Sequence, residues 1–437
     1  MRMAAVIGAG WAGCAAAAEL AEHGYQVNLF EASRTLGGRA RCVEVDGKLL
    51  DNGQHILLGA YSDTLALIKR LGLREQDAIL RLPLQMRYPP DSGGMDFVAP
   101  RLPAPLHMAI ALLRAKGLSR DDKLALARFT TTARWMGWRL DNDCSVAELL
   151  SRYDQTPRLI KLLWQPLCIA ALNTPLEQAS AQVFLAVLRD SLGARKRSAS
   201  DMLIPRSDLS TLLPQQTARF VQARGGKVLA GQAVKSLERG DTRWTLHTAS
   251  ESFEADVVVI ATPVWQAATL LDGLMDCTTL QAFEHEPITT CYLQYDEQLA
   301  LPLPFYALVD DAAQQAWGQF VFDRAWLNPD QKGLLAVVIS TSEDAIEAGQ
   351  EALTQSIARQ LATALNNDAL LAPRWSRVIT EKRATFSCKP ALQRPAVTTD
   401  LPGLVLAGDY CESEYPATLE TAVRSGLQAA RALLNNA

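Results

Sequence analysis

A closely spaced set of glycines near the N-terminus is the first group of residues that could do chemistry. They occur in residues 8–13, which read Gly-Ala-Gly-Trp-Ala-Gly. Gly8 allows a tight turn, Gly10 lets the backbone approach a pyrophosphate, and Gly13 lets a helix pack closely on the preceding strand. A helix that starts here offers free N–H groups and a partial positive charge to phosphate. The segment predicts a dinucleotide site made by Gly8, Gly10, Trp11, Ala12 and Gly13.

The elements around this turn must be a strand, a helix and a second strand if it is to bind a dinucleotide. The apolar residues 4–7 predict a buried strand, residues 14–23 an alanine-rich helix, and residues 25–30 a second strand. Glu31 follows Gly13 by 18 residues, where a carboxylate accepts a hydrogen bond from a ribose hydroxyl. An acidic residue here disfavours a 2′-phosphate, but the pattern alone does not separate NAD from FAD.

A second glycine-rich turn follows shortly after Glu31. Residues 36–40 read Leu-Gly-Gly-Arg-Ala. Paired glycines let the backbone come close to a phosphate, and a guanidinium neutralises and hydrogen-bonds it. We therefore interpret Gly38 and Arg39 as a second clamp on the same dinucleotide.

The third chemical segment lies near the C-terminus. Residues 404–407 predict a strand, and Gly408 and Asp409 follow it. Asp409 at a strand end suits a ribitol hydroxyl. A final helix that begins near Thr418 and Leu419 would direct its positive end at the negative part of a reduced isoalloxazine ring. Together the three segments favour FAD over NAD, held non-covalently.

These motifs resemble those of the FAD-dependent amine oxidase and phytoene desaturase superfamily, and most closely its isoprenoid branch. That branch contains plant-type phytoene desaturases and a squalene-associated, desaturase-like group. The segments that carry the resemblance cover nearly the whole chain and are residues 51–61, 164–174, 407–410 and 424–426.

The resemblance implies an α/β fold: a Rossmann-like FAD-binding domain of the glutathione reductase and amine oxidase type, with an interleaved α+β substrate domain. The FAD-binding domain would be discontinuous, with residues 225–237, 243–247 and 257–260 continuing its sheet. The expected boundaries are 1–85, 205–284 and 396–437 for the FAD-binding domain and 86–204 and 285–395 for a substrate domain whose first part is mostly helical.

The resemblance also implies an activity: reductive removal of the hydroxyl of hydroxysqualene in hopanoid or triterpenoid synthesis. Gln54 stands where the desaturases carry an apolar residue, which favours dehydroxylation over simple desaturation. The alternatives are a carotenoid-type desaturase, an amine oxidase and a flavin-less prenyl-binding protein. The sequence does not identify the electron donor, and other enzymes of squalene and hopanoid synthesis are possible partners.

Loss of a hydroxyl as water requires a proton donor near the leaving oxygen. His55 is the leading candidate, in a Gly-flanked turn that the superfamily places near the flavin, and Gln54 could orient the hydroxyl. The loop after Asp409 offers further acids, among them Tyr410 and Glu414. By the same resemblance Gly53 and Val234 would contact FAD, whereas Arg394 is interpreted as structural.

Residues 101–140 are strongly basic, with eight Lys or Arg and two Asp, in a chain whose net charge is −4. Basic helices with exposed aromatic residues suit an anionic membrane surface. A squalene-sized hydrocarbon would reside in the bilayer, since its transfer from water is favourable by on the order of 20 kcal/mol. We therefore expect a cytoplasmic protein, peripheral to the inner face of the membrane, with 101–140 as the contact region.

The overall composition excludes several other classes of protein. Apolar residues are 49% and charged residues 21% of the 437 residues, as in globular enzymes. The slightly acidic balance argues against nucleic acid as a partner. No apolar run reaches the ~18–20 residues of a membrane span, and the eight cysteines show no metal-binding spacing.

Overall fold

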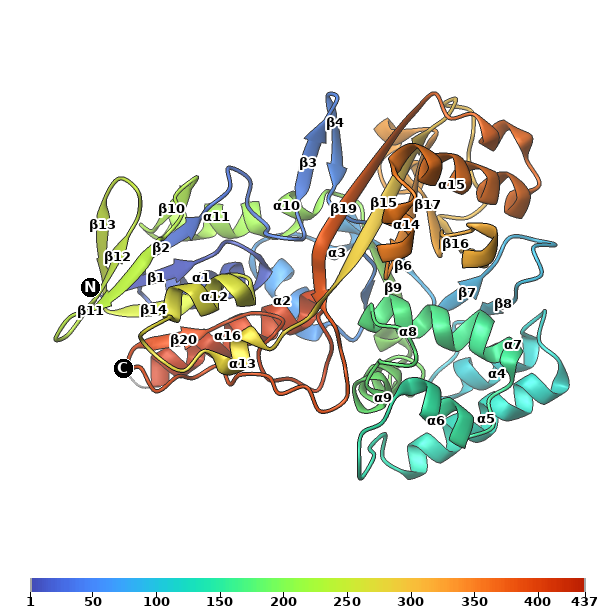
Figure 1. The fold of residues 1–437 in the computed structure, drawn as a ribbon, viewed down its shortest axis with the longest axis horizontal. Helices are drawn as coiled ribbons and strands as arrows, with labels where there is room; N and C mark the ends of the chain where they lie inside the picture. The colour runs from blue at the N-terminus through green and yellow to red at the C-terminus, as the bar shows by residue number, and fades with distance from the viewer. Residues whose placement is uncertain (1, 436–437) are drawn as a thin grey trace.

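The computed structural model describes residues 2–435, which form two lobes joined along their middle (Figure 1). One lobe holds both described ends of the chain and a parallel sheet. The other holds an antiparallel sheet and a group of helices. Two long strands, β15 (His285–Gln294) and β19 (Trp375–Phe386), run between the lobes.

The first lobe is built on a five-stranded sheet in the order β10-β2-β1-β14-β20. All its neighbouring strands are parallel. The strands predicted at 4–7, 25–30, 257–260 and 404–407 are confirmed as members of it. The strand bounds are β1 (Met3–Ile7), β2 (Gln26–Glu31), β10 (Lys227–Ala230), β14 (Val257–Ile260) and β20 (Leu404–Leu406).

One face of this sheet is covered by α1 (Trp11–Glu22) and the C-terminal helix α16 (Leu419–Asn435). The alanines of α1 are buried, because small side chains let the helix lie close to both the sheet and α16. A Cβ atom added at Gly426 of α16 would lie 2.1 Å from the Ala12 carbonyl oxygen. The two helices therefore approach closely only because this position is glycine.

The other face is covered by α12 (Val264–Leu271) and a small antiparallel sheet, β11-β12-β13. This corrects the prediction that residues 225–237 and 243–247 continue the parallel sheet. Only β10 does so, because the chain turns away at residues 231–235. The strands β11 (Ser236–Arg239), β12 (Trp244–His247) and β13 (Ser252–Ala255) then pair with one another, with Phe253 against Phe30.

The second lobe holds a five-stranded sheet in the order β16-β17-β18-β15-β19, antiparallel throughout. Its remaining strands are β16 (Phe305–Ala307), β17 (Phe320–Asp323) and β18 (Leu334–Ser340). Helix α15 (Gln350–Leu365) packs on one face through a cluster that includes Cys291 and Leu293. The opposite face looks toward residues 51–55, because Tyr292 donates its hydroxyl hydrogen to the Asp51 carbonyl oxygen at 2.8 Å.

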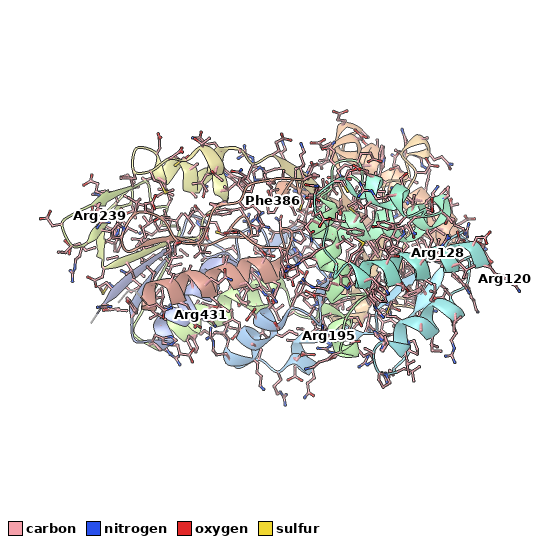
Figure 2. All side chains as sticks on the ribbon, turned by 90° about the horizontal axis from the view of Figure 1, so that it is seen from below. Arg120, Arg128, Arg195, Arg239, Phe386 and Arg431 are labelled. Atoms are coloured by element: carbon pink, nitrogen blue, oxygen red, sulfur yellow. The ribbon has the colours of Figure 1, made fainter. Side chains whose placement is uncertain are left out.

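Helices fill the rest of the second lobe, as predicted for the segment that begins at residue 86. A capping box between Ser119 and Asp122 fixes the start of α5. Figure 2 shows Arg120 and Arg128 of α5 at the far end of the molecule from Arg239. The helices are α4 (Leu106–Arg114), α5 (Arg120–Trp135), α6 (Val146–Arg152), α7 (Pro157–Leu159), α8 (Gln165–Leu172) and α9 (Ala181–Asp190), with a π-helical turn at Ile160–Trp164.

The remaining helices and strands are short. The further helices are α2 (Ser62–Arg70), α3 (Glu75–Ala78), α10 (Leu209–Leu212), α11 (Pro214–Gln222), α13 (Thr278–Gln281) and α14 (Glu343–Glu347). The further strands are β3 (Cys42–Val45), β4 (Lys48–Asp51), β5 (Leu57–Leu58), β6 (Ile79–Leu82), β7 (Gln85–Arg87), β8 (Asp96–Val98) and β9 (Met202–Pro205). Over residues 2–435, no helix is both long enough and apolar enough to cross a membrane.

Candidate functional site

The first glycine turn links β1 to α1 at the carboxyl end of the parallel sheet. Gly8 has a φ of +104°, and a Cβ atom there would lie 2.5 Å from the Ala261 carbonyl oxygen. A Cβ atom at Gly13 would lie 1.8 Å from the Gly8 carbonyl oxygen. No side chain caps the start of α1, and its first turn holds no acidic residue. The turn thus leaves the first N–H groups of α1 available to an anion.

The second glycine turn lies directly against the first. The Gly37 N–H donates to the Ala9 carbonyl oxygen at 2.9 Å, and the added Cβ of Gly38 would lie 3.2 Å from the Gly10 α-carbon. Two stretches of bare backbone therefore face each other. This is the arrangement that a pyrophosphate requires, so the residues present fit a dinucleotide.

Glu31 lies beside the same turn. One of its carboxylate oxygens accepts from the Ala9 N–H and the other from the Ser33 N–H, both at 2.9 Å. The loop that contains Val234 is tied to this point, because the Gln232 N–H donates to the Glu31 carbonyl oxygen. The structure therefore brings Glu31 and the Val234 loop to one end of the glycine turns.

Arg39 and Asp409, predicted from segments 370 residues apart, form an ion pair at 2.6 Å. Arg39 also donates to the Ala384 carbonyl oxygen at 2.8 Å. Burial opposes the charged guanidinium, but the Asp409 carboxylate outweighs it and raises the pKa of Arg39. The phosphate clamp and the C-terminal segment thus meet at one place.

The loop that carries Asp409 is held by Arg394. This half-buried guanidinium donates only to main-chain oxygens, and burial lowers its pKa. It therefore acts as a brace for the loop, in agreement with its structural interpretation. The oxygens are those of Asp409, Tyr410, Ser413 and Tyr415, at 2.6–3.3 Å.

The start of α16 lies next to the loop that carries Asp409. Thr418 caps the helix by accepting from the Thr421 N–H at 3.2 Å, and Leu419 is the first helical residue. The Gly408 N–H donates to the Ser425 hydroxyl at 2.9 Å, which ties the loop to the helix. The predicted helix start is confirmed.

His55 lies in the turn after β4, and its Nδ1 is 2.7 Å from the Gly53 carbonyl oxygen. Because a carbonyl only accepts, Nδ1 carries the hydrogen. Burial lowers the pKa of His55, with the hydrogen bond to Gly53 opposing it. The ring is therefore neutral near pH 7, and its Nε2 is an acceptor there rather than a proton donor.

Gln54 is held by an arginine that sequence reasoning missed. The Arg324 guanidinium donates to the Gln54 side-chain oxygen at 2.5 Å and lies 3.8 Å from the Asp51 carboxylate. Arg324 and Asp51 are both 3% exposed. Arg324 follows β17 and has no motif around it, so no local signal in the sequence could have linked it to Gln54.

Tyr410 and Glu414, the other two predicted acids, have different surroundings. Tyr410 is buried and its hydroxyl has no hydrogen-bond partner among residues 2–435. Burial raises the pKa of Tyr410 well above its ordinary value, so it remains a phenol. Glu414 instead pairs with Arg189 at 2.8 Å, which lowers the pKa of its carboxyl. The structure therefore gives a protonated hydroxyl at Tyr410 and an ionised, half-exposed carboxylate at Glu414.

Tyr410 borders a small cavity between the two lobes. Residues from five separate parts of the chain line it, and they include both members of the Arg39–Asp409 ion pair. The cavity is therefore a place where a guanidinium, a carboxylate and a phenol meet aromatic rings. The lining residues are Arg39, Pro263, Val264, Trp265, His285, Phe386, Asp409 and Tyr410.

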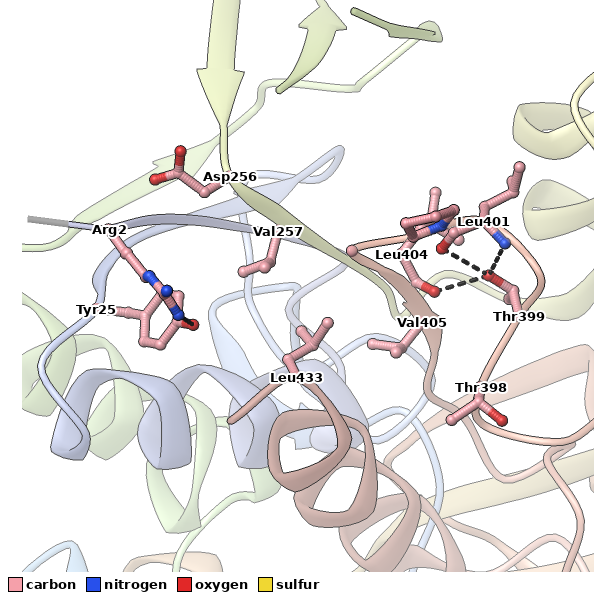
Figure 3. Close-up of a pocket in the computed structure, with 12 residues that line it drawn as sticks. Arg2, Tyr25, Asp256, Val257, Thr398, Thr399, Leu401, Leu404, Val405 and Leu433 are labelled. Atoms are coloured by element: carbon pink, nitrogen blue, oxygen red, sulfur yellow. Dashed lines mark hydrogen bonds between the residues drawn. The ribbon is translucent and has the colours of Figure 1, made fainter. Parts of the chain in front are cut away.

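A larger hollow of about 400 Å³ lies at the opposite edge of the parallel sheet. Figure 3 shows Arg2, Tyr25 and Asp256 on one side of it and Thr399 and Leu401 on the other. It lies at the amino ends of β1 and β14, whereas ligands of such sheets bind at the carboxyl ends. It is therefore separate from the candidate site. Among residues 2–435, no cluster of three or more His, Cys, Asp or Glu could hold a metal ion.

Comparison with known proteins gives consistent matches over the whole chain. Residues 11–434 match the family model described as flavin containing amine oxidoreductase. The hydroxysqualene dehydroxylase of Rhodopseudomonas palustris is 31% identical, over 98% of this chain and 97% of that protein. The zeta-carotene desaturase of Synechocystis sp. is 24% identical, over 99% and 97%. Cyclohexylamine oxidase from Brevibacterium oxydans shares the fold, with a TM-score of 0.69, 18% identity and 99% coverage of both chains.

Proposed function

The chain belongs to the flavin-containing amine oxidoreductase family, and from this premise we propose that it converts hydroxysqualene reductively to squalene in hopanoid or triterpenoid synthesis. It is an FAD-dependent oxidoreductase with the α/β fold of this family. The observation that carries the proposal is the similarity, over nearly its full length, to a hydroxysqualene dehydroxylase. We also place FAD in the cradle formed by the two glycine turns, with Glu31 at the ribose.

FAD would be bound without a covalent link. The two cysteines nearest the C-terminal segment are Cys388 and Cys411, and both are buried. Burial raises the pKa of each thiol to about 12. A covalent bond to flavin needs a reactive thiolate, which neither residue provides at neutral pH.

In the proposed reaction the carbon–oxygen bond breaks, a proton and the hydroxyl leave as water, and a carbon–hydrogen bond forms. Reduced FAD, when bound, supplies the hydride. Tyr410 remains a proposed source of the proton, because its buried phenol has no hydrogen-bond partner among residues 2–435. His55 would accept a hydrogen bond at Nε2. Exclusion of water from the site would protect the allylic cation that loss of the hydroxyl creates.

The experiment is an anaerobic assay of the purified yellow protein with hydroxysqualene in detergent and a chemical reductant of flavin. We expect stoichiometric squalene. A carotenoid-type desaturation is the second candidate, favoured by the zeta-carotene desaturase relative. Desaturation of phytoene without any squalene would establish the desaturase. Oxidation of an amine would establish an amine oxidase. A colourless protein that takes up no FAD would indicate a prenyl-binding role.

We further propose that α4 and α5 contact the membrane from which the substrate comes. Of the large apolar side chains that are exposed, most belong to this region: Leu102, Leu106, Leu113, Leu124 and Trp135, the last 88% exposed. Basic residues lie among them, and Lys123 of α5 donates to the Leu113 carbonyl oxygen of α4 at 2.9 Å. Exposed apolar groups in a basic surface suit an anionic bilayer.

A further inference from the structure

Thr290 is a buried residue in the middle of β15 that neither the sequence motifs nor the comparisons indicate. Both neighbouring strands pair with it, opposite Val338 on β18 and Ile379 on β19. Its side chain points to the same face as Tyr292, because side chains alternate along a strand. That face looks toward residues 51–55.

The Thr290 hydroxyl has no partner. The residue is 1% exposed, and its Oγ1 forms no hydrogen bond within residues 2–435. The adjacent Thr289 shows the usual arrangement, since its hydroxyl bonds to those of Ser342 and Thr380 at 2.9 Å. Buried hydroxyls are nearly always paired. A valine would fill the space between Val338 and Ile379 equally well, because it has the same shape as threonine without the oxygen.

The hydroxyl is directed at the turn that carries His55. A Cβ atom added at Gly53 would lie 3.8 Å from both Thr290 Oγ1 and His55 Cε1. No side chain at Gly53 therefore separates Thr290 Oγ1 from His55. An oxygen atom of a ligand admitted beside Gly53 would meet a donor at Thr290 and an acceptor at His55.

We propose that Thr290 is the residue that recognises the substrate hydroxyl, by donating a hydrogen bond to the oxygen that later leaves as water. This inference rests on the proposed function. Thr290 would bind and orient the carbon–oxygen bond without itself transferring a proton. It would thereby distinguish hydroxysqualene from the product, squalene, which lacks the oxygen.

The test measures binding separately from turnover. Thr290→Val and Thr290→Ser are prepared with FAD bound, and hydroxysqualene or squalene is titrated in detergent while the flavin absorption is followed. We expect Thr290→Val to weaken hydroxysqualene binding by about 10- to 100-fold, with squalene binding unchanged. Thr290→Ser retains the oxygen and should stay within about threefold of the original protein. Both expectations hold only for variants whose FAD content and melting temperature match the parent.

The matched control is Thr64→Val in α2, which also removes a buried hydroxyl that has no hydrogen-bond partner in the described part of the chain. It should alter neither affinity. If Thr290→Val binds and converts hydroxysqualene like the parent protein, the inference for Thr290 is wrong while the proposed function stands. If the parent protein itself neither binds nor converts hydroxysqualene, the proposed function fails, and the role of Thr290 fails with it.

Discussion

Arg39 and Asp409 show how single residues hold the candidate site together. Asp409 is buried enough that an isolated charge would be unfavourable, and the partly exposed Arg39 neutralises it at 2.6 Å. The pair also ties residues near the N-terminus to the loop before α16. Its two members could be predicted singly from their motifs, but their contact could not.

Replacing Arg39 by methionine should leave Asp409 as an unpaired buried carboxylate. We expect the FAD content of the purified protein, measured as the ratio of flavin to protein absorption, to fall at least about tenfold. Arg374→Met is the control, because its ion pair with Asp296 is exposed and contributes little. Equal FAD content in both variants would rule out the role of Arg39.

Asp51 predicts a pH dependence of stability. Burial raises the pKa of its carboxyl from 3.8 to about 6, although Arg324 acts in the opposite direction. The folded protein therefore binds this proton more tightly than the unfolded chain does. The protonated Asp51 carboxyl therefore contributes roughly 3 kcal/mol to the free energy of unfolding below about pH 4. This contribution is lost as the pH rises to about 6.

Denaturant unfolding of the FAD-loaded protein at several pH values would detect this effect. The difference in unfolding free energy between Asp51→Asn and the parent should change in favour of the variant between pH 4 and pH 6.5. Asp330→Asn, on an exposed turn, should show a constant difference. A constant difference for Asp51→Asn as well would mean that the Asp51 carboxyl titrates normally.

At the scale of elements, the spacing between α1 and α16 determines whether the cofactor cradle can form. Gly13 sets the distance from α1 to the strand, and Gly426 sets the distance from α16 to α1. Neither distance tolerates a methyl group without movement of backbone. The first glycine belongs to a recognisable motif, whereas the second lies in an ordinary helical stretch.

Gly426→Ala should therefore destabilise the protein even though alanine favours a helix by about 1 kcal/mol. The added carbon would lie 2.1 Å from the Ala12 carbonyl oxygen, so α16 must move away from α1. We expect a lower melting temperature and a lower FAD content. Gln428→Ala, at an exposed position of the same helix, should be neutral or slightly stabilising.

The elements that sequence could predict are those whose signals are local. The strand, turn and helix at residues 3–22 depend on neighbouring residues, and so does the end of β20. The prediction that β12 joins the parallel sheet was wrong, because the sequence of a short amphipathic strand does not indicate which sheet it pairs with. Arg324 and Thr290 could not be found either, since their partners are brought to them by the packing of distant segments. The division into two discontinuous domains stays a prediction.

At the scale of the whole molecule, exposed apolar groups gather at the end that carries α4 and α5. Vesicle sedimentation checks the proposed membrane contact. Binding to vesicles of anionic lipid should fall several-fold in Leu113→Ser/Trp135→Ser, and in the parent protein it should weaken as salt is raised. Leu371→Ser, an exposed leucine elsewhere, is the control. Equal binding of all three proteins to anionic vesicles would argue against contact through this surface.

The order of strands in the parallel sheet has a consequence for how the protein is made. β1 emerges first from the ribosome, but its neighbour β14 follows about 250 residues later, and α16 about 400 residues later. At about 5–20 residues per second, the alanine face of α1 stays uncovered for roughly 20–80 seconds. The nascent chain therefore exposes this face until α16 is made, and a product that ends before residue 419 would lack the helix that covers it.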